Sequence, residues 1–260
     1  MGEKAGTMTE LSEILSAVNA KIKAACARAG RSCDEVEIVA VTKTHGPETV
    51  REAWDAGLSI VGENKVQEAA WKKPESVTGP SWHLIGHLQG NKVRPALMLF
   101  DFIHSVDSLR LIERISSISE ETGARPHILL EVNVSGEKSK TGMEPGLVDE
   151  AVRAILERCP RIELEGFMTM APFSANPEDS RPVFRALRNL RDETERRFGI
   201  SLPRLSMGMS GDYEVAVEEG ATWIRLGTVL FGERPKVKGG ASFSGLDSYS
   251  GEGPVAKVLD

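Results

Sequence analysis

Short apolar segments alternate with longer amphipathic segments along almost the whole chain. Residues 36–43 (VEIVAVTK) are rich in β-branched residues, which is typical of a buried strand. Further strand candidates begin near Leu58, Trp82, Phe102, His127, Ile162, Arg204 and Thr222. Strands that alternate with helices form a parallel sheet with right-handed crossovers. Eight such units favour a (β/α)8 barrel over an open sheet of five or six strands. The sequence therefore predicts an α/β protein of the TIM-barrel class.

The segments between these strands carry apolar residues at helical spacing. In residues 108–122, Asp107 or Ser108 can cap the start and Gly123 can end the helix. An extra helix is predicted before the first strand, over residues 8–29. The other predicted helices are 47–56, 64–73, 91–99, 108–122, 146–159, 178–198 and 212–219. The many Arg and Glu residues of 178–198 are interpreted as a solvated face.

The chain divides into one domain and a tail. Residues 1–235 hold all the strand and helix patterns, so we expect a single barrel. Residues 236–260 contain five Gly, four Ser and few large apolar residues, which predicts a flexible tail.

Charge and cysteine content exclude several classes of protein. The formal charge of −6 argues against a duplex nucleic-acid binder, because phosphate contacts need a basic face. No apolar run approaches the roughly 18 residues of a membrane span, and the first residues do not have the pattern of a secretory signal. The three cysteines include no C-x-x-C pair, which indicates a reducing compartment and argues against a zinc site. We expect a cytoplasmic protein without a metal.

Lys43 ends the first predicted strand, and the carboxyl ends of barrel strands are where reactive groups lie. An apolar strand behind this lysine would desolvate its amine, lower the amine pKa and yield the neutral nucleophile that a Schiff base needs. A solvated lysine that merely leaves a strand is the alternative interpretation.

Two segments near the end of the barrel suit a phosphate. Residues 205–212 (LSMGMSGD) combine small residues and hydroxyls at the seventh strand, and residues 223–228 (WIRLGT) follow at the eighth. Loops after these two strands form the usual phosphate site of this fold. Arg225 can point into the barrel mouth, where it needs a ligand or an ion-pair partner.

Two further residues are candidates at the mouth. His83 can pack against a flat ring, although a single histidine on a strand is more often hydrogen-bonded in the core. Asn64 follows the second strand, where it can bind a ligand or cap the next helix. No carboxylate cluster accompanies the histidines of this segment, so the sequence does not indicate a metal site.

A site for pyridoxal 5′-phosphate, PLP, needs an amine, a phosphate cradle, a partner for the ring nitrogen and a wall for the ring. The chain resembles the pyridoxal-phosphate homeostasis proteins, whose fold is similar to the N-terminal barrel of alanine racemase. The matching stretches are AVTKTHGPETV (40–50), GLSIVGENKVQEA (57–69), WHLIGHLQGNK (82–92), HSVDS (104–108), VNVSGEKSKTGM (132–143), EGFMTMAP (165–172) and LSMGMSGDYEVAVEEGATWIRLGTVLFGER (205–234).

The resemblance implies a fold-type III PLP-binding barrel and assigns roles to residues of this chain. It implies that Lys43 forms the Schiff base and that Ser210, Gly227 and Thr228, with Ser206, bind the phosphate. It places Arg225 at the pyridine nitrogen. An arginine only donates hydrogen bonds, so it leaves that nitrogen unprotonated and the ring a poor electron sink.

The racemases carry a second, β-rich domain that supplies an opposing acid/base tyrosine and closes a dimeric site. Only the Gly/Ser tail follows the barrel here. We therefore expect a monomer that holds PLP and passes it on to PLP-dependent apo-enzymes, with effects on amino-acid and keto-acid balance. A racemase-like enzyme, and a barrel that binds another phosphorylated metabolite without a Schiff base, are the alternatives.

Overall fold

A computed structural model of the chain describes residues 10–137 and 140–232. The predicted tail, 236–260, and the predicted end of the domain at residue 235 lie outside the described residues, as do the first two residues of the predicted leading helix.

Eight parallel strands form a closed barrel in which each strand pairs with its neighbours in sequence, and the first pairs with the last. The strands are β1 (Glu37–Val41), β2 (Ile60–Glu63), β3 (Ser81–Leu84), β4 (Phe102–Val106), β5 (His127–Glu131), β6 (Glu163–Met168), β7 (Arg204–Met209) and β8 (Trp223–Leu226). The predicted TIM-barrel fold is confirmed. One boundary is corrected, because β1 ends at Val41 and Lys43 lies in the turn that follows.

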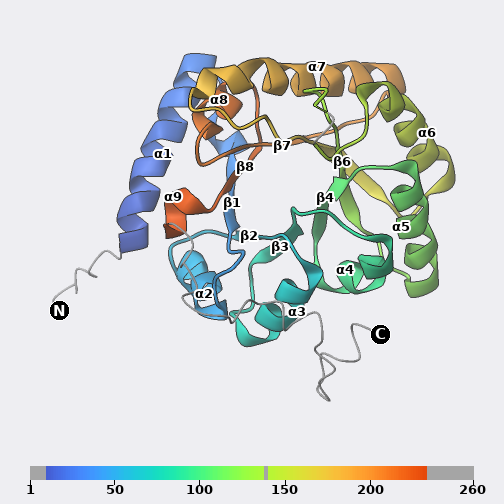
Figure 1. Ribbon diagram of the computed structural model, residues 1–260, viewed down its shortest axis with the longest axis horizontal. Coiled ribbons are helices and arrows are strands. Elements are labelled where there is room, and N and C mark those ends of the chain that lie inside the picture. The colour runs from blue at the N-terminus through green and yellow to red at the C-terminus, as the bar shows by residue number, and fades with distance from the viewer. Residues whose placement is uncertain (1–9, 138–139, 233–260) are drawn as a thin grey trace.

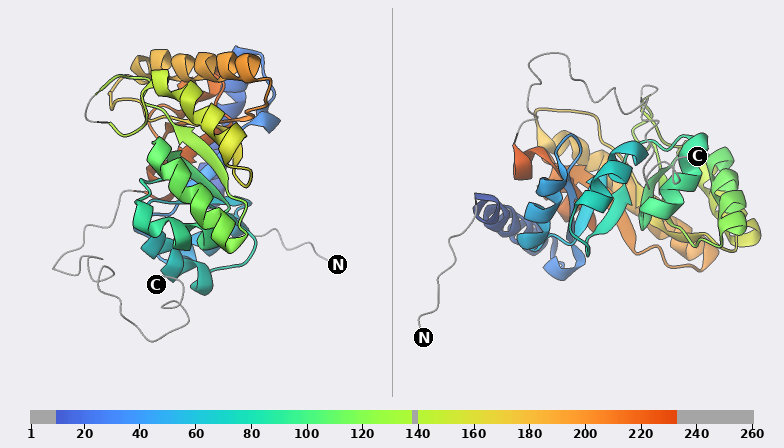
Figure 2. Two further views of the ribbon diagram at one scale, coloured as in Figure 1. Left: turned by 90° about the vertical axis from the view of Figure 1, so that its right-hand side faces the viewer. Right: turned by 90° about the horizontal axis from the view of Figure 1, so that it is seen from below.

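The helices form a ring outside the strands (Figure 1). They are α1 (Glu10–Ala29), α2 (Pro47–Asp55), α3 (Val66–Glu75), α4 (Val93–Leu99), α5 (Leu109–Thr122), α6 (Val148–Arg158), α7 (Arg181–Phe198), α8 (Tyr213–Glu218) and α9 (Thr228–Phe231). Figure 2 shows α5 and α6 side by side on the outer surface. Within the described segments, no helix combines the length and the apolar composition needed to cross a bilayer.

Local sequence explains where individual helices begin and end. The Ser108 hydroxyl accepts the backbone N–H of Leu111 and caps α5, and Gly123 ends that helix at a φ of 76°. Residues 177–180, predicted in part as helix, form a 3-10 turn before α7. The single-turn helix α9 was not predicted, because four residues show no periodicity.

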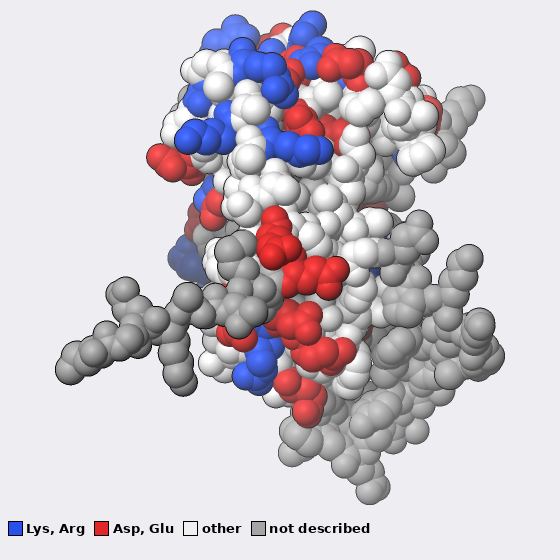
Figure 3. Space-filling model, turned by 90° about the vertical axis from the view of Figure 1, so that its left-hand side faces the viewer, with Lys and Arg blue, Asp and Glu red and all other residues white. Residues whose placement is uncertain are grey.

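The leading helix α1 packs along α8 and α9 at one side of the barrel. Its buried stripe is Val18, Ile22, Ala25 and Cys26. Arg28 of α1 adds an ion pair with Glu218 of α8 at 2.6 Å. Figure 3 shows this side, with Lys and Arg gathered over its upper part and Asp and Glu over its middle and lower parts.

The arginines at the start of α7 lie against acidic residues of α8. Arg181, Arg185 and Arg188 all form ion pairs with Glu219, at 2.9–3.3 Å. Because these arginines share the buried carboxylate of Glu219, they form an ion-pair network at the start of α7.

Apolar side chains fill two regions. The larger lies between the barrel and its helices, and the smaller lies inside the barrel. The inner group consists of Val39, Ile60, Leu129, Met168 and Trp223, one from each of five strands. These positions define the inward face of their strands, because side chains alternate along a strand.

A chain of hydrogen bonds also runs through the barrel interior. His83 Nδ1 lies 2.9 Å from His104 Nε2, and His104 Nδ1 lies 2.9 Å from Ser206 Oγ. Arg225 Nη1 donates to the same Ser206 Oγ at 2.8 Å. At its other end the chain reaches Ser81, whose Oγ is 3.1 Å from His83 Nε2.

Arg225 occupies one acceptor position of Ser206 Oγ, because a guanidinium only donates, and the Ser206 O–H can then donate to His104. When Ser206 accepts from Arg225 and donates to His104, His104 donates to His83 and His83 donates to Ser81. This pattern requires both imidazoles to be neutral. Burial removes the hydration of the charged form, so it lowers the pKa of His83 to about 3 and holds the pKa of His104 well below its usual value.

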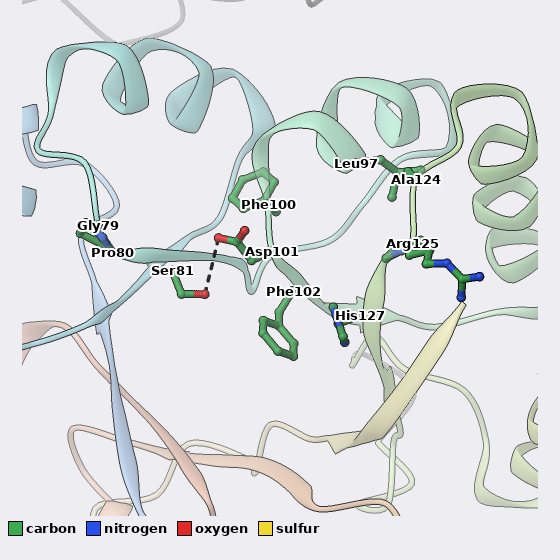
Figure 4. Close-up of a pocket in the computed structure, with 11 residues that line it drawn as sticks. Gly79, Pro80, Ser81, Leu97, Phe100, Asp101, Phe102, Ala124, Arg125 and His127 are labelled. Carbon is green, nitrogen blue, oxygen red and sulfur yellow. Dashed lines mark hydrogen bonds between the residues drawn. The ribbon is translucent and has the colours of Figure 1, made fainter. Parts of the chain in front are cut away.

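This series of hydrogen bonds ends at Ser81, beside a pocket at the amino ends of the strands (Figure 4). Ser81 donates weakly to Asp101 at 3.5 Å, and Asp101 also accepts the backbone N–H of Trp82 at 2.8 Å. The rings of Phe102 and His127, 5.0 Å apart, line the same pocket. None of the described residues that line it belongs to the predicted site.

Gly166 is required by the backbone of β6. Its φ is 153°, and a Cβ there would overlap the carbonyl oxygen of Arg204 on β7. We predict that Gly166→Ala lowers the free energy of unfolding by more than about 2 kcal/mol, measured by urea unfolding. Gly146→Ala is the matched control, because a Cβ at Gly146 meets no atom within 4 Å. Equal stability of the two variants would contradict the geometry.

The two buried histidines should make the fold sensitive to acid. They stay neutral in the folded state, whereas an unfolded histidine binds a proton below about pH 6.5. Stability is therefore full above pH 6.5 and falls as the pH is lowered toward 3. We predict that His83→Gln makes the unfolding free energy depend less steeply on pH between 6.5 and 4. The slope should fall by up to about 1.4 kcal/mol per pH unit.

Urea unfolding at several pH values measures this slope, which is independent of the stability that the substitution itself removes. His104→Gln should reduce it in the same way. An unchanged slope in both variants would show that these histidines bind protons in the folded protein.

Candidate functional site

A cavity of about 720 Å³ opens at the carboxyl ends of the strands, the end where barrel enzymes place their reactive groups. Six of the eight predicted site residues line it. They are Lys43, Asn64, Ser210, Arg225, Gly227 and Thr228. The structure thus brings together residues from the ends of β1, β2, β7 and β8.

Lys43 reaches the cavity through the alternation of β1. Val39 packs inside the barrel, and Val41 and Lys43, two and four residues later, both line the cavity. Ala40 and Thr42 are buried and fall on the other face. The predicted lysine therefore lies at the rim of the cavity, just beyond the carboxyl end of β1.

Asn64 is held at the mouth by close packing of two loops. It follows Glu63, the last residue of β2. Ile60 of that strand points into the barrel, and Asn64, four residues later, lies on the same face and lines the cavity. Gly86 of the next loop lies so close to the Asn64 backbone that a Cβ on Gly86 would overlap it. The Ser105 hydroxyl donates to the Gly86 carbonyl at 2.6 Å and holds that loop in place.

Ser210, Gly227 and Thr228 come from two neighbouring loops that hydrogen-bond to each other. The Val229 N–H donates to Ser210 Oγ at 3.3 Å, which joins the loop after β7 to the start of α9. A Cβ on Gly227 would lie 3.3 Å from Val41, so the backbone there leaves little space. Hydroxyls and close backbone groups of this kind suit an anion.

Arg225 is buried in the barrel mouth, with 5% of its surface exposed. Its guanidinium donates to Ser206 Oγ and to the Thr169 carbonyl, both at 2.8 Å, and these acceptors are neutral. Burial lowers the pKa of Arg225 to about 10, which Asp212 and Glu131 partly oppose through space. The side chain remains a cation at neutral pH and lines the cavity.

The structure places the other two predicted residues below the cavity. His83 is fully buried between Phe102, His104 and Trp223, with ring centroids 4.7–4.9 Å away. The next inward residue of that segment, Ile85, occupies the mouth layer instead. Ser206 likewise lies beneath Arg225 as its hydrogen-bond acceptor. Neither side chain lines the cavity, so a ring wall at His83 and a phosphate contact at Ser206 stay predictions.

Further polar residues line the cavity that the sequence patterns did not single out. Glu131 ends β5, accepts a hydrogen bond from Thr141, and has its pKa raised by burial. His45 and His87 also line the cavity. Burial lowers the pKa of His45, and His87 Nδ1 lies 3.2 Å from Asp107. Glu131 at the end of β5, and His45 and His87 in the loops after β1 and β3, could have been found from their positions at the carboxyl ends of strands.

The arrangement combines an amine, a cation and an anion cradle in one cavity. Such a set can hold a molecule that carries an anionic group and a carbonyl. In the described part of the chain, no group of three or more His, Cys, Asp or Glu side chains is placed to hold a metal ion.

Comparison with known proteins agrees with this geometry. Residues 15–235 match the family described as alanine racemase, N-terminal domain. A pyridoxal phosphate homeostasis protein of Aquifex aeolicus is 46% identical over 224 residues, which is 85% of this chain and 97% of that protein. The protein of that name from Escherichia coli K12 is 37% identical over 87% of this chain and 98% of its own length.

Solved structures show the same relationship. PipY of Synechococcus elongatus, solved without PLP, superposes with a TM-score of 0.77 at 36% identity, over 86% of this chain and 100% of that one. The PLP-bound structure of PipY gives a TM-score of 0.75 at 35% identity over the same shares. Alanine racemase of Clostridium difficile shares the fold, with a TM-score of 0.65 at 16% identity over 85% of this chain and 57% of the racemase. The chain belongs to the pyridoxal phosphate homeostasis protein family, within the wider group of alanine racemase N-terminal barrels.

Proposed function

We propose that the protein binds pyridoxal 5′-phosphate through a reversible covalent bond to Lys43 and serves the intracellular homeostasis of this cofactor. The single observation that carries this proposal is the convergence of Lys43, Arg225 and the Ser210, Gly227 and Thr228 loops on one cavity. The relatives named above, and PLP-bound PipY, support it.

The residues present fit the cofactor. When bound, PLP supplies an aldehyde that condenses with a lysine amine with loss of water. Ser210, Gly227 and Thr228 would hold the phosphate, and Asn64 would hydrogen-bond the cofactor. Val41, Ile85 and Met170 supply apolar walls.

Arg225 would restrict the chemistry of the bound ring. Its pKa of about 10 keeps it charged, and a guanidinium beside the ring nitrogen donates a hydrogen bond and gives up no proton. Ser206 and the Thr169 carbonyl hold the guanidinium from behind. Because an unprotonated ring stabilises carbanions poorly, this environment disfavours broad carbanion chemistry on the bound cofactor.

The cellular role extends from this binding. We propose that the protein acts as a monomer in the cytoplasm, limits free aldehyde and passes PLP to apo-enzymes, with effects on amino-acid and keto-acid balance. Its three cysteines are free thiols in the structure, which suits a reducing compartment.

The bond to Lys43 can be measured by absorption spectroscopy. We predict that the protein incubated with PLP shows an absorption band distinct from that of the free cofactor, and that Lys43→Ala abolishes it. Lys65→Ala is the control, because Lys65 is exposed and close in sequence to Asn64. A Lys43→Ala protein that keeps the band would identify Lys43 as the wrong lysine.

A racemase-like activity is the second candidate, because Glu131, His45 and His87 place additional titratable groups around the cavity. Racemisation needs acid/base groups on both faces of the substrate. We predict no enzyme-like incorporation of solvent deuterium at the α-carbon of a panel of L-amino acids, measured by mass spectrometry. Rapid incorporation that depends on Lys43 would replace the carrier proposal with an enzyme.

A further inference from the structure

Lys72 of α3 is a lysine with no exposed surface, in the layer between the barrel wall and the helices. Its ammonium donates to the Thr42 carbonyl, to Glu63 Oε1 and to Glu68 Oε1, each at 2.8 Å. A lysine ammonium has three donors, so these contacts use all of them. The cation is therefore built into a specific arrangement of acceptors.

The same cluster holds the backbone on both sides of Lys43. Before Lys43, the Thr42 carbonyl accepts from Lys72, and the Thr42 hydroxyl donates to Glu63 at 2.6 Å. After Lys43, the Thr44 N–H donates to Glu68. Two consecutive peptide groups around the lysine are thus fixed by one group of charged side chains.

Thr44 shows why this backbone needs support. Its φ is 69°, and among the described residues it is the only one other than glycine with a positive φ. The left-handed region is unfavourable for a β-branched residue, so it persists only where the surroundings impose it. The His45 N–H also donates to the Thr42 carbonyl, at 3.1 Å, and closes the turn that carries Lys43.

Stability alone does not account for the cluster. Buried charges lose their hydration, and an apolar group of similar volume often stabilises a fold as well as a buried ion pair does. Glu63 is fully buried, and its Oε2 has no hydrogen-bond partner. Burial raises the pKa of Glu63 to about 7, against the opposing effect of Lys72. An arrangement that is this costly and lies this close to Lys43 points to a role in the site.

We infer that Lys72, Glu63 and Glu68 form a positioning cluster that fixes the left-handed turn at Thr44 and thereby aims the Lys43 amine into the cavity. Side chains alternate between the two faces of β1 and β2. Thr42 and Glu63 therefore face α3, while Lys43 and Asn64 line the cavity. This inference rests on the proposed function for the role of Lys43, while the clamp on the Thr44 peptide can be measured without the cofactor.

Glu68 is the best position for a test, because its side chain is 14% exposed and it is the contact of the Thr44 N–H. Glu68→Ala removes the acceptor, whereas Glu68→Gln keeps an acceptor oxygen at the same length. Lys73→Met is the matched control. Lys73 follows Lys72 in α3 and donates to the Leu99 carbonyl at 2.6 Å, so its loss weakens packing away from the cluster.

Two quantities are measured on each variant, after thermal unfolding has confirmed that it folds. The first is amide hydrogen exchange at Thr44 in the PLP-free protein, followed by NMR, with the Trp82 amide as internal reference. The second is the dissociation constant of PLP. For Glu68→Ala we expect at least tenfold faster exchange at Thr44 and at least tenfold weaker PLP binding. Glu68→Gln and Lys73→Met should stay within about threefold of the unaltered protein.

Wild-type exchange at Thr44 together with wild-type PLP affinity in folded Glu68→Ala would overturn the inference. So would faster exchange without weaker binding, because the turn would then not position Lys43. If the unaltered protein binds no PLP at Lys43, the proposed function fails, and the exchange result still decides whether the clamp exists. If Glu68→Ala does not fold, Lys72→Arg replaces it, since a planar guanidinium does not reproduce the three ammonium contacts. The same tenfold changes are expected there, and their absence would overturn the inference.

Discussion

The alternation of side chains along eight closed strands is the constraint on which the rest of this molecule depends. Inward positions of β1 run from Val39 to Val41 and, beyond the strand, to Lys43. Outward positions meet the helices, so Thr42 contacts Lys72 of α3. β1 therefore supplies both a wall of the cavity and an anchor to the helical layer. Lys43 lies in the cavity because of this alternation, and the turn after β1 keeps it there.

The polar interior of the barrel has a cost that the site explains. Two neutral histidines, Ser206 and Arg225 occupy positions that apolar residues fill in an ordinary barrel core. When each group in this series of hydrogen bonds donates to the next, from Arg225 toward Ser81, every donor meets an acceptor. Burial then leaves no unmatched group along the series. Arg225 is thus a cation fixed at the mouth, and among the described residues no carboxylate hydrogen-bonds to it. Its charge is available to a ligand.

Much of the fold could be predicted from the sequence. The strands β4, β5 and β7 begin at Phe102, His127 and Arg204, as predicted, because each follows a clear break in the apolar pattern. The leading helix and the barrel class follow from periodicity and from the number of repeats. The turn at Lys43 was not predicted, since the contact that holds Thr44 at a positive φ comes from Glu68, 24 positions away in the sequence.

The candidate site was predictable in part for a related reason. A single strand shows which residues point inward, but their height in the barrel depends on the stagger between neighbouring strands. His83 and Ser206 point inward as expected, and the structure places them one layer below the residues that line the cavity. Glu131 lies at the right height, yet a glutamate at the end of an apolar strand carries no motif.

The central claim is that Lys43 is the covalent anchor of the cofactor in this cavity. Borohydride reduction of the PLP-loaded protein, followed by proteolysis and mass spectrometry, identifies the lysine that carries it. The geometry predicts a single modified peptide, the one that contains Lys43. Modification of a different lysine, or no fixed cofactor at all, would contradict it.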